Sequence, residues 1–133
     1  MAIKTDHDGI FLLLLENGSD PSTLVDGTEP VLCRVLKNQD YQYGRWLVTY
    51  GADVDARDAN KDTPLVILTK QNQIKEVNFL LEHKADPSKK DGSENSPLCI
   101  AISNDTLEVA NALIKAGADV NDTDGNHDTP LAL

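Results

Sequence analysis

Few side chains in this sequence of 133 residues could act as a nucleophile, a base or a metal ligand. There are two cysteines, Cys33 and Cys99, and three histidines, His7, His83 and His127. Nucleophilic catalysis requires a base held beside its nucleophile, and zinc sites require close spacings such as CxxC or HxxxH; neither pattern is present. We therefore expect no catalytic residue and no metal, exposed histidines, and cysteines that pack in the core of a protein from a reducing, intracellular compartment.

Two acidic segments resemble calcium-binding loops because side chains that carry oxygen alternate along them. They are residues 58–62 and 122–128. Both lack the glycine that such a loop needs at its sixth position, and no closing glutamate follows the second segment. We interpret both as tips of acidic hairpins, and we expect no cofactor.

The charge balance restricts the class of partner. The chain has 22 acidic and 12 basic side chains, a formal net charge of -10. Nucleic acid binding needs clustered lysine and arginine, which are absent, so we expect no nucleic acid partner. The longest apolar run, Ile10 to Leu15, is far shorter than the twenty or so residues of a membrane span, so we expect no membrane association either.

The elements that position these residues follow from a repeat along the chain. One segment of similar sequence occurs four times without gaps and at a constant spacing, beginning at Leu14, Leu47, Leu80 and Leu113. A second series interleaves with it at spacings of 34, 33 and 33, namely Glu29-Pro30, Thr63-Pro64, Ser96-Pro97 and Thr129-Pro130. Two interleaved series at one period predict stacked units, because one unit cannot bury its apolar face alone.

Each unit is predicted to contain two helices. A hydroxyl residue followed by proline predicts the start of the first helix, since the hydroxyl caps free N–H groups and proline fits the first helical position. The second helix carries an apolar stripe that we expect to be buried in every unit. The stripe comprises Asp8, Phe11, Leu14 and Leu15, then Tyr41, Gly44, Leu47 and Val48, then Ile74, Val77, Leu80 and Leu81, and finally Leu107, Ala110, Leu113 and Ile114.

The ends of the second helices are predicted to be left-handed. Gly18, Gly51 and Gly117 fall there, and Lys84 stands at the equivalent position of the third unit. A lysine in that conformation should cost about 1 kcal/mol relative to glycine. The polar, Asp-rich loops that follow predict short hairpins.

Four aromatic residues crowd into positions 41–50. Tyr41 and Trp46 align with Ile74 and Phe79 of the next unit, so we expect these two to pack in the core. The roles of Tyr43 and Tyr50 stay open between packing and partner recognition.

This pattern resembles the ankyrin repeat family. The matching residues are Asp58, Thr63-Pro64-Leu65, Leu80-Leu81 and Ala85-Asp86 in one unit and Asp91, Pro97-Leu98, Ala101, Leu113 and Gly117-Ala118-Asp119-Val120-Asn121 in the next. The resemblance implies an all-α repeat solenoid, a stack of helix-turn-helix units joined by β-hairpin loops, in one domain of residues 1–133. We divide it into complete units 25–57, 58–90 and 91–123, with a partial unit 1–24 and a truncated unit 124–133.

The chain departs from the family pattern in two ways. The histidine that usually follows Thr-Pro-Leu is replaced by Leu32, Val66, Cys99 and Ala132, so its hydrogen bonds between units are not expected. The first complete unit is interpreted as having one extra residue between Pro30 and Gly51, with Glu29 in place of the capping hydroxyl.

The resemblance implies a non-enzymatic module that binds a protein through a concave surface of hairpin tips and first helices. Carried over position by position, this surface comprises Arg57, Asp58, Asn60, Asp62, Lys70, Gln71, Lys90, Asp91, Ser93, Asn95, Ser103, Asn104, Asp124, Asn126 and Asp128. Because the set is polar and mostly acidic, we expect a basic protein partner. The alternative is a regulatory or spacer segment of a larger enzyme, channel or effector.

Overall fold

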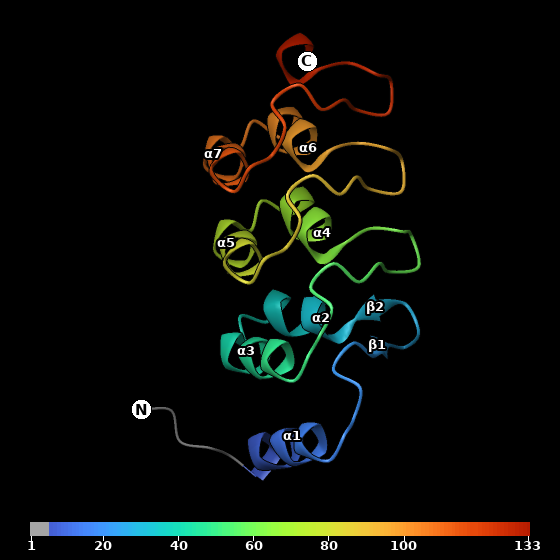
Figure 1. Ribbon diagram of the computed structural model, residues 1–133, viewed down its shortest axis with the longest axis vertical. Coiled ribbons are helices and arrows are strands. Elements are labelled where there is room, and N and C mark those ends of the chain that lie inside the picture. Colours follow the sequence, from blue (N-terminus) through green and yellow to red (C-terminus); the bar gives the residue numbers. More distant parts are fainter. Residues whose placement is uncertain (1–5) are drawn as a thin grey trace.

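Seven α-helices stack along one axis in the computed structural model, which describes residues 6–133 (Figure 1). One row contains the first helices of the units, α2 (Val31–Lys37), α4 (Pro64–Lys70) and α6 (Pro97–Ser103). The second row contains α1 (Asp6–Glu16), α3 (Tyr41–Thr49), α5 (Ile74–Glu82) and α7 (Leu107–Lys115). A 3₁₀ turn, η1 (Pro130–Ala132), follows at the far end of the first row. The expected stack of helix-turn-helix units is confirmed.

Four long loops project to the same side of the first helices (Figure 1). We name their turns finger 1 (24–30), finger 2 (57–63), finger 3 (90–96) and finger 4 (123–129). Only finger 1 contains strands, β1 (Leu24–Val25) and β2 (Glu29–Pro30), which pair antiparallel. Fingers 2–4 have no assigned strand, so the prediction of β-hairpins holds for finger 1 alone among the described residues.

The first helices begin at one constant spacing, at Val31, Pro64 and Pro97. Pro30 therefore occupies the position before the helix, which Thr63 and Ser96 occupy in the next units. The predicted extra residue after Pro30 was wrong, because proline can precede a helix as well as begin it. Glu29 is the equivalent of Asp62, and Cys33, not Leu32, is the equivalent of Val66 and Cys99.

The two later first helices start as expected. The Thr63 hydroxyl accepts a hydrogen bond from the N–H of Val66 at 3.3 Å, and the Ser96 hydroxyl accepts one from the N–H of Cys99 at 3.1 Å. Pro30 makes no such cap. The hydroxyls therefore satisfy one free donor in each of two helices, a contribution of about 1 kcal/mol each.

The second helices end in left-handed residues, as predicted. Lys84 has a φ of 72°, and Gly18, Gly51 and Gly117 have φ values of 93°, 97° and 103°. The next N–H, that of Ala85, bonds to the carbonyl of Leu80 at 3.0 Å, as that of Ala52 does to Leu47. A lysine thus adopts the backbone conformation that glycine supplies in the other units.

The apolar stripe of the second helices is buried only inside the stack. Leu47, Leu80 and Leu113 are 1, 0 and 0% exposed, whereas their equivalent Leu14 in α1 is 53% exposed. In α7, Leu107 and Ile114 are also exposed. The prediction that the stripe is buried in every unit was therefore wrong for part of each end helix, because the residues that would contact a further unit have none beside them among the described residues.

The first helices supply the other half of the core. The position at which the family pattern has histidine is occupied by Cys33, Val66 and Cys99. All three residues are at most 1% exposed. Burial raises the pKa of the Cys33 thiol to about 12, and the nearby Glu29 carboxylate adds to the shift. Both cysteines are therefore packing residues, as expected, and Cys33 is not a reactive thiolate.

Aromatic side chains join α1 to α3. Phe11 stacks on Tyr43 with 4.3 Å between ring centroids and lies 6.2 Å from the ring of Trp46. Tyr43 also donates a hydrogen bond to Asp8, and Tyr41 donates one to Glu76 of α5 at 2.8 Å. Tyr41, Tyr43 and Trp46 are half-buried, which confirms packing for Tyr41 and Trp46 and answers the question for Tyr43, while Tyr50 is exposed.

Candidate functional site

Fingers 2–4 are each closed by the carboxylate of their first aspartate. Asp58 Oδ1 accepts hydrogen bonds from the N–H groups of Asn60 and Asp62, at 2.8 and 2.9 Å. The backbone N–H of Asp58 donates back to the carbonyl of Asp62 at 2.9 Å. The same bonds recur around Asp91 in finger 3 and around Asp124 in finger 4. In these loops, hydrogen bonds to one aspartate side chain hold the turn in place of strand pairing.

The finger tips carry residues with left-handed backbone. Lys61, Glu94 and His127 have φ values of 65°, 68° and 68°, and all three are exposed. They recur at the period of the units, directly after Asn60, Ser93 and Asn126, which the sequence selected. These tip residues were missed, although their spacing was a usable signal. Their charges differ, so the row of tips is less uniformly acidic than predicted.

Neighbouring fingers are bonded to one another through backbone groups. Asp62 Oδ1 accepts from the N–H of Gly92 at 2.9 Å, and Asn95 Oδ1 accepts from the N–H of Gly125 at 2.7 Å. A Cβ at Gly92 would lie 2.2 Å from the carbonyl oxygen of Asn60, so glycine is required by the close approach. The fingers therefore form one braced row.

Basic side chains also bridge adjacent units. Arg57 Nη1 donates to the carbonyls of Lys61 at 2.6 Å and Lys90 at 2.9 Å. Lys90 Nζ in turn donates to Thr123 Oγ1 at 3.1 Å and lies 3.5 Å from a carboxylate oxygen of Asp122. Arg57 and Lys90 stand at the same place in their units, so this contact is repeated along the stack.

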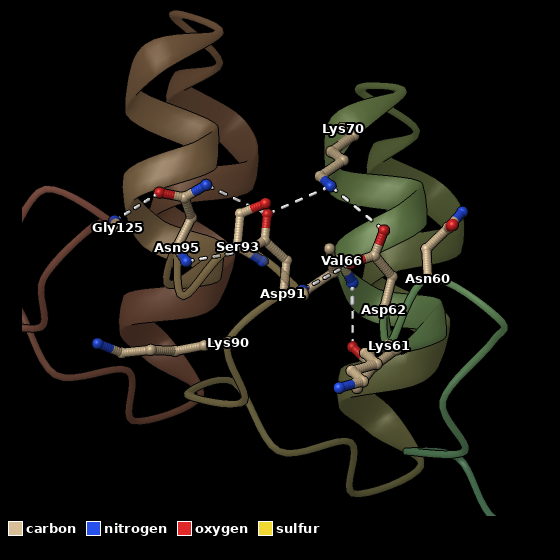
Figure 2. A network of polar contacts seen from close by, with 12 residues as sticks. Asn60, Lys61, Asp62, Val66, Lys70, Lys90, Asp91, Ser93, Asn95 and Gly125 are labelled. Atoms are coloured by element: carbon tan, nitrogen blue, oxygen red, sulfur yellow. Dashed lines mark hydrogen bonds and ion pairs between the residues drawn. The ribbon is translucent and has the colours of Figure 1, made fainter.

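Lys70 lies between two carboxylates of successive units (Figure 2). Its Nζ is 3.3 Å from Asp62 Oδ2 and 3.2 Å from Asp91 Oδ2. Burial alone would raise the pKa of Asp91, but the N–H groups of Asn95 and Ser93 together with Lys70 hold that pKa below its ordinary value. Burial would likewise lower the pKa of Lys70, yet its bonds to Asp91 and Asp62 raise it.

Finger 1 has its own version of this ion pair. Glu29, the equivalent of Asp62, bonds to Lys37, the equivalent of Lys70, and to Arg34. Burial would raise the pKa of Glu29, but its hydrogen bonds to Lys37 and Arg34 lower it. We did not predict this pair, because our alignment of the repeats was shifted by one residue in this unit.

Most of the side chains selected from the sequence lie on one surface, which we call the finger face: fingers 2–4 with the exposed ends of α4 and α6. The exposed members are Arg57, Asn60, Lys70, Gln71, Ser93, Ser103, Asn104, Asn126 and Asp128. The half-buried members are Asp58, Asp62, Lys90, Asn95 and Asp124. Asp91 is the exception, because its side chain is 2% exposed and supports finger 3 and Lys70 instead of facing solvent.

A hollow of about 260 Å³ lies on the finger face, beside α6 and fingers 3 and 4. Its lining includes five of the selected residues, Lys70, Asn95, Ser103, Asn104 and Asp124, above Cys99 and Ile100. On its rim, Asn104 Nδ2 and Thr106 Oγ1 both donate to Asn72 Oδ1, at 3.3 and 2.8 Å. Asn72 and Thr106 were not selected from the sequence, because their bonds join one unit to the next.

The groups that could do chemistry are not brought together. His83 is half-buried and not exposed as expected, because its Nδ1 lies 2.8 Å from the carbonyl of Phe79 and its ring stacks on the Phe79 ring. His127 is at a finger tip, and Cys99 Sγ contacts the carbonyl of Asp122 at 3.5 Å. Within residues 6–133, no group of three or more His, Cys, Asp or Glu side chains is arranged to hold a metal ion. In the same range, no helix is long and apolar enough to span a membrane.

Comparison with protein families places the chain beside a known repeat family. A family model described as ankyrin repeats, in three copies, matches residues 32–124, well over half of the chain. The matched range runs from α2 to finger 4 and so includes the hollow and fingers 2 and 3. No curated protein matches the chain.

Proposed function

Because the chain belongs to the ankyrin repeat family, whose members are generally protein–protein interaction modules and typically not enzymes, we propose that it binds a protein partner through the finger face. The observation that carries this proposal is the braced row of fingers. Their backbones are tied internally and to one another, while the side chains of the tips are exposed. A rigid surface with free polar side chains loses little conformational entropy on binding.

The hollow between α4, α6 and fingers 3 and 4 gives this surface a concave part. Its lining contains the donor groups of Lys70 and Ser103 and the oxygens of Asn95 and Asp124, beside Cys99 and Ile100. A side chain of a partner that enters it would meet both kinds of group. We propose this hollow as the anchor point, since binding energy concentrates in small, desolvated pockets.

We further propose a partner with a basic surface. The net charge of -10 attracts a cationic partner at long range, although Lys70 already neutralises part of Asp62 and Asp91. The charged groups of the face therefore contribute to the association rate more than to the final contacts. The rate constant of association should fall as ionic strength rises, while the dissociation rate changes little.

A pair of matched variants tests the site. Ser103→Trp fills the hollow with a large side chain, and Asn111→Trp places the same side chain at an exposed position on α7. A partner captured by the unmodified chain should bind Asn111→Trp equally and Ser103→Trp at least about tenfold more weakly. Equal binding to both variants, or loss with Asn111→Trp alone, would move the binding site away from the finger face.

A further inference from the structure

Large hydrophobic side chains are exposed mainly toward the two ends of the stack. Between residues 25 and 106, Tyr50 is the only exposed one. On α1 the exposed side chains are Ile10, Leu13 and Leu14, which are 57, 56 and 53% exposed, and on α7 and η1 they are Leu107, Ile114 and Leu131, which are 81, 46 and 98% exposed. Leu24, Val120 and Leu133, outside these helices, are 39, 52 and 47% exposed. Each end therefore presents an apolar surface that the polar finger face does not explain.

One sequence spacing recurs in the contacts between neighbouring second helices. Tyr43 bonds to Asp8, and Tyr41 bonds to Glu76, so in both pairs the partners are 35 residues apart. Phe11 contacts Trp46 at the same spacing. Gly44 and Phe79 repeat it, since a Cβ on Gly44 would lie 3.1 Å from the Phe79 ring. These four pairs thus share a spacing of 35 residues between one unit and the next, beside the stacking of Phe11 on Tyr43 at a spacing of 32.

The same rule assigns partners to the exposed residues of α7. Leu107 is equivalent to Tyr41, and Ala110 is equivalent to Gly44. In a longer stack, the residues 35 positions after Leu107 and Ala110 would lie four repeat periods after Ile10 and Leu13. Ile10 and Leu13 are themselves equivalent to Tyr43 and Trp46. A second copy stacked by the unit-to-unit step would therefore place its Ile10 on Leu107 and its Leu13 on Ala110. Both pairings match in chemistry, and the second sets a large side chain on a small one, as in the Gly44–Phe79 contact.

The first row of helices offers a matching pair of surfaces. At the α1 end, a hollow of about 370 Å³ lies beside α2, lined by Phe11, Leu14, Leu15, Val31 and Leu47 with three polar residues. It occupies the place at which the first helix of a preceding unit would pack. At the opposite end, η1 is the first turn of such a helix, and its Leu131 is equivalent to the buried Leu98 and Leu65.

We propose that copies of this chain stack end to end, with α7 and η1 of one copy on α1 and the adjacent hollow of the next. The contact continues the packing of α5 on α7 and of α4 on α6 inside the chain. It joins two different surfaces and does not close on itself, so it produces chains of increasing length and not a symmetric dimer. The net charge of -10 on every copy opposes stacking, and added salt strengthens it.

Two complementary variants test the proposal. Leu13→Glu blocks the α1 end, and Leu107→Glu blocks the α7 end; both side chains are more than half exposed, so neither change disturbs the core. The average mass of the unmodified chain, measured by sedimentation at about 0.15 M salt, should rise with concentration. Each variant should associate at least about tenfold more weakly and stay monomeric in that range.

The mixture of the two variants gives the decisive result. One keeps a working α7 end and the other a working α1 end, so equal amounts should form a heterodimer and nothing larger. Tyr50→Glu, at an exposed site in the middle of the stack, should associate like the unmodified chain. An unmodified chain that stays monomeric up to millimolar concentration would overturn the proposal. So would a dimer that survives both single substitutions, or a mixture that remains monomeric.

Discussion

Finger 1 and finger 3 stand at the same place in their units but are held by different interactions. In finger 1, β1 and β2 pair around a turn at Asp26 and Gly27, both of which have positive φ. In finger 3, the buried carboxylate of Asp91 accepts from two N–H groups, and Lys70 of the preceding unit reaches it. The residue of finger 1 equivalent to Asp91 is Val25, which has no side-chain acceptor at all.

This difference shows which residues a finger needs for its shape and which remain available for binding. A turn closed by one aspartate does not need the side chains at its tip, so Ser93 and Glu94 face solvent. A turn closed by strand pairing depends on residues along both strands. Fingers 2–4 are therefore better suited to vary their tips than finger 1, and the finger face lies where the carboxylate turns are.

The largest expected effect is the loss of the Asp91 carboxylate. Asp91→Ala should lower the free energy of unfolding by about 3 kcal/mol, because it removes several hydrogen bonds and leaves Lys70 with one partner. The matched change in finger 1, Val25→Ala, should cost about 1 kcal/mol through lost apolar contact. Urea denaturation of both variants measures the difference. Equal costs would mean that the carboxylate does not hold finger 3.

The next effect concerns the close approach of fingers 2 and 3. Gly92→Ala should cost about 2 kcal/mol, because its Cβ would lie 2.2 Å from the carbonyl oxygen of Asn60. The equivalent residue facing finger 1 is already Ala59, whose N–H bonds to the carbonyl of Thr28 at 3.0 Å. Ala59→Gly should therefore change the free energy of unfolding by less than about 1 kcal/mol. A larger loss of stability for Ala59→Gly than for Gly92→Ala, in thermal or urea unfolding, would contradict the close contact between fingers 2 and 3.

Unfolding at low pH should distinguish Lys70, which serves finger 3, from Lys37, which serves finger 1, by how much each contributes to the free energy of unfolding. The pKa of Asp91 is lower in the folded chain than the ordinary 3.8, so its stabilising effect is present above about pH 4 and is lost as the pH falls through the folded value. Lys70→Met raises that pKa and moves acid unfolding to higher pH. It should cost about 1 kcal/mol at neutral pH, allowing for the exposure of the lysine, and less at about pH 3.

Lys37→Met is the control in finger 1. The pKa of Glu29 is also lowered, from the ordinary 4.5, so the sign of the pH dependence is the same. Arg34 remains as a partner for Glu29, and Lys37 does not join two units. The loss should therefore be smaller than for Lys70→Met. Unfolding curves over a range of pH measure both losses. A larger loss in the free energy of unfolding for Lys37→Met than for Lys70→Met would contradict this prediction.

The smallest effect extends the comparison to the second helices. Lys84→Gly should raise the free energy of unfolding by about 0.5 to 1 kcal/mol, because φ is 72° and glycine adopts this conformation without strain. Gly51→Ala, at the equivalent position, should lower it by a similar amount. The melting temperatures of the two variants should move in opposite directions. A drop for Lys84→Gly would show that the lysine side chain stabilises the helix end.

The helical framework could be predicted because its signals are local. The hydroxyl–proline pairs at Pro64 and Pro97 and the left-handed position of Lys84 depend on a few adjacent residues. The error at Pro30 has the same origin, since the pattern was aligned on the proline and not on the constant period of the units. Glu29 and Asp62 keep that period and would have given the correct register.

The features that could not be predicted involve contacts between units. The burial of Asp91 depends on Lys70 reaching it from the previous unit, and the exposure of Leu107 depends on the lack of a unit beyond α7 among the described residues. Neither follows from the pattern within one unit. The surface position of Asn60, Ser93 and Asn126 could be predicted, because the tip of a polar loop is exposed whatever its neighbours are.

The pair of Tyr41 and Glu76 has a consequence for how such a chain can change in evolution. The hydroxyl of Tyr41 meets a carboxylate that is almost wholly buried, at the junction of two particular units. If the whole unit 58–90 were excised, the helices could still stack, but Tyr41 would meet Val109 and lose its acceptor. Units of one shape are therefore not interchangeable, and their order along the polypeptide is fixed by the side chains that meet at each junction.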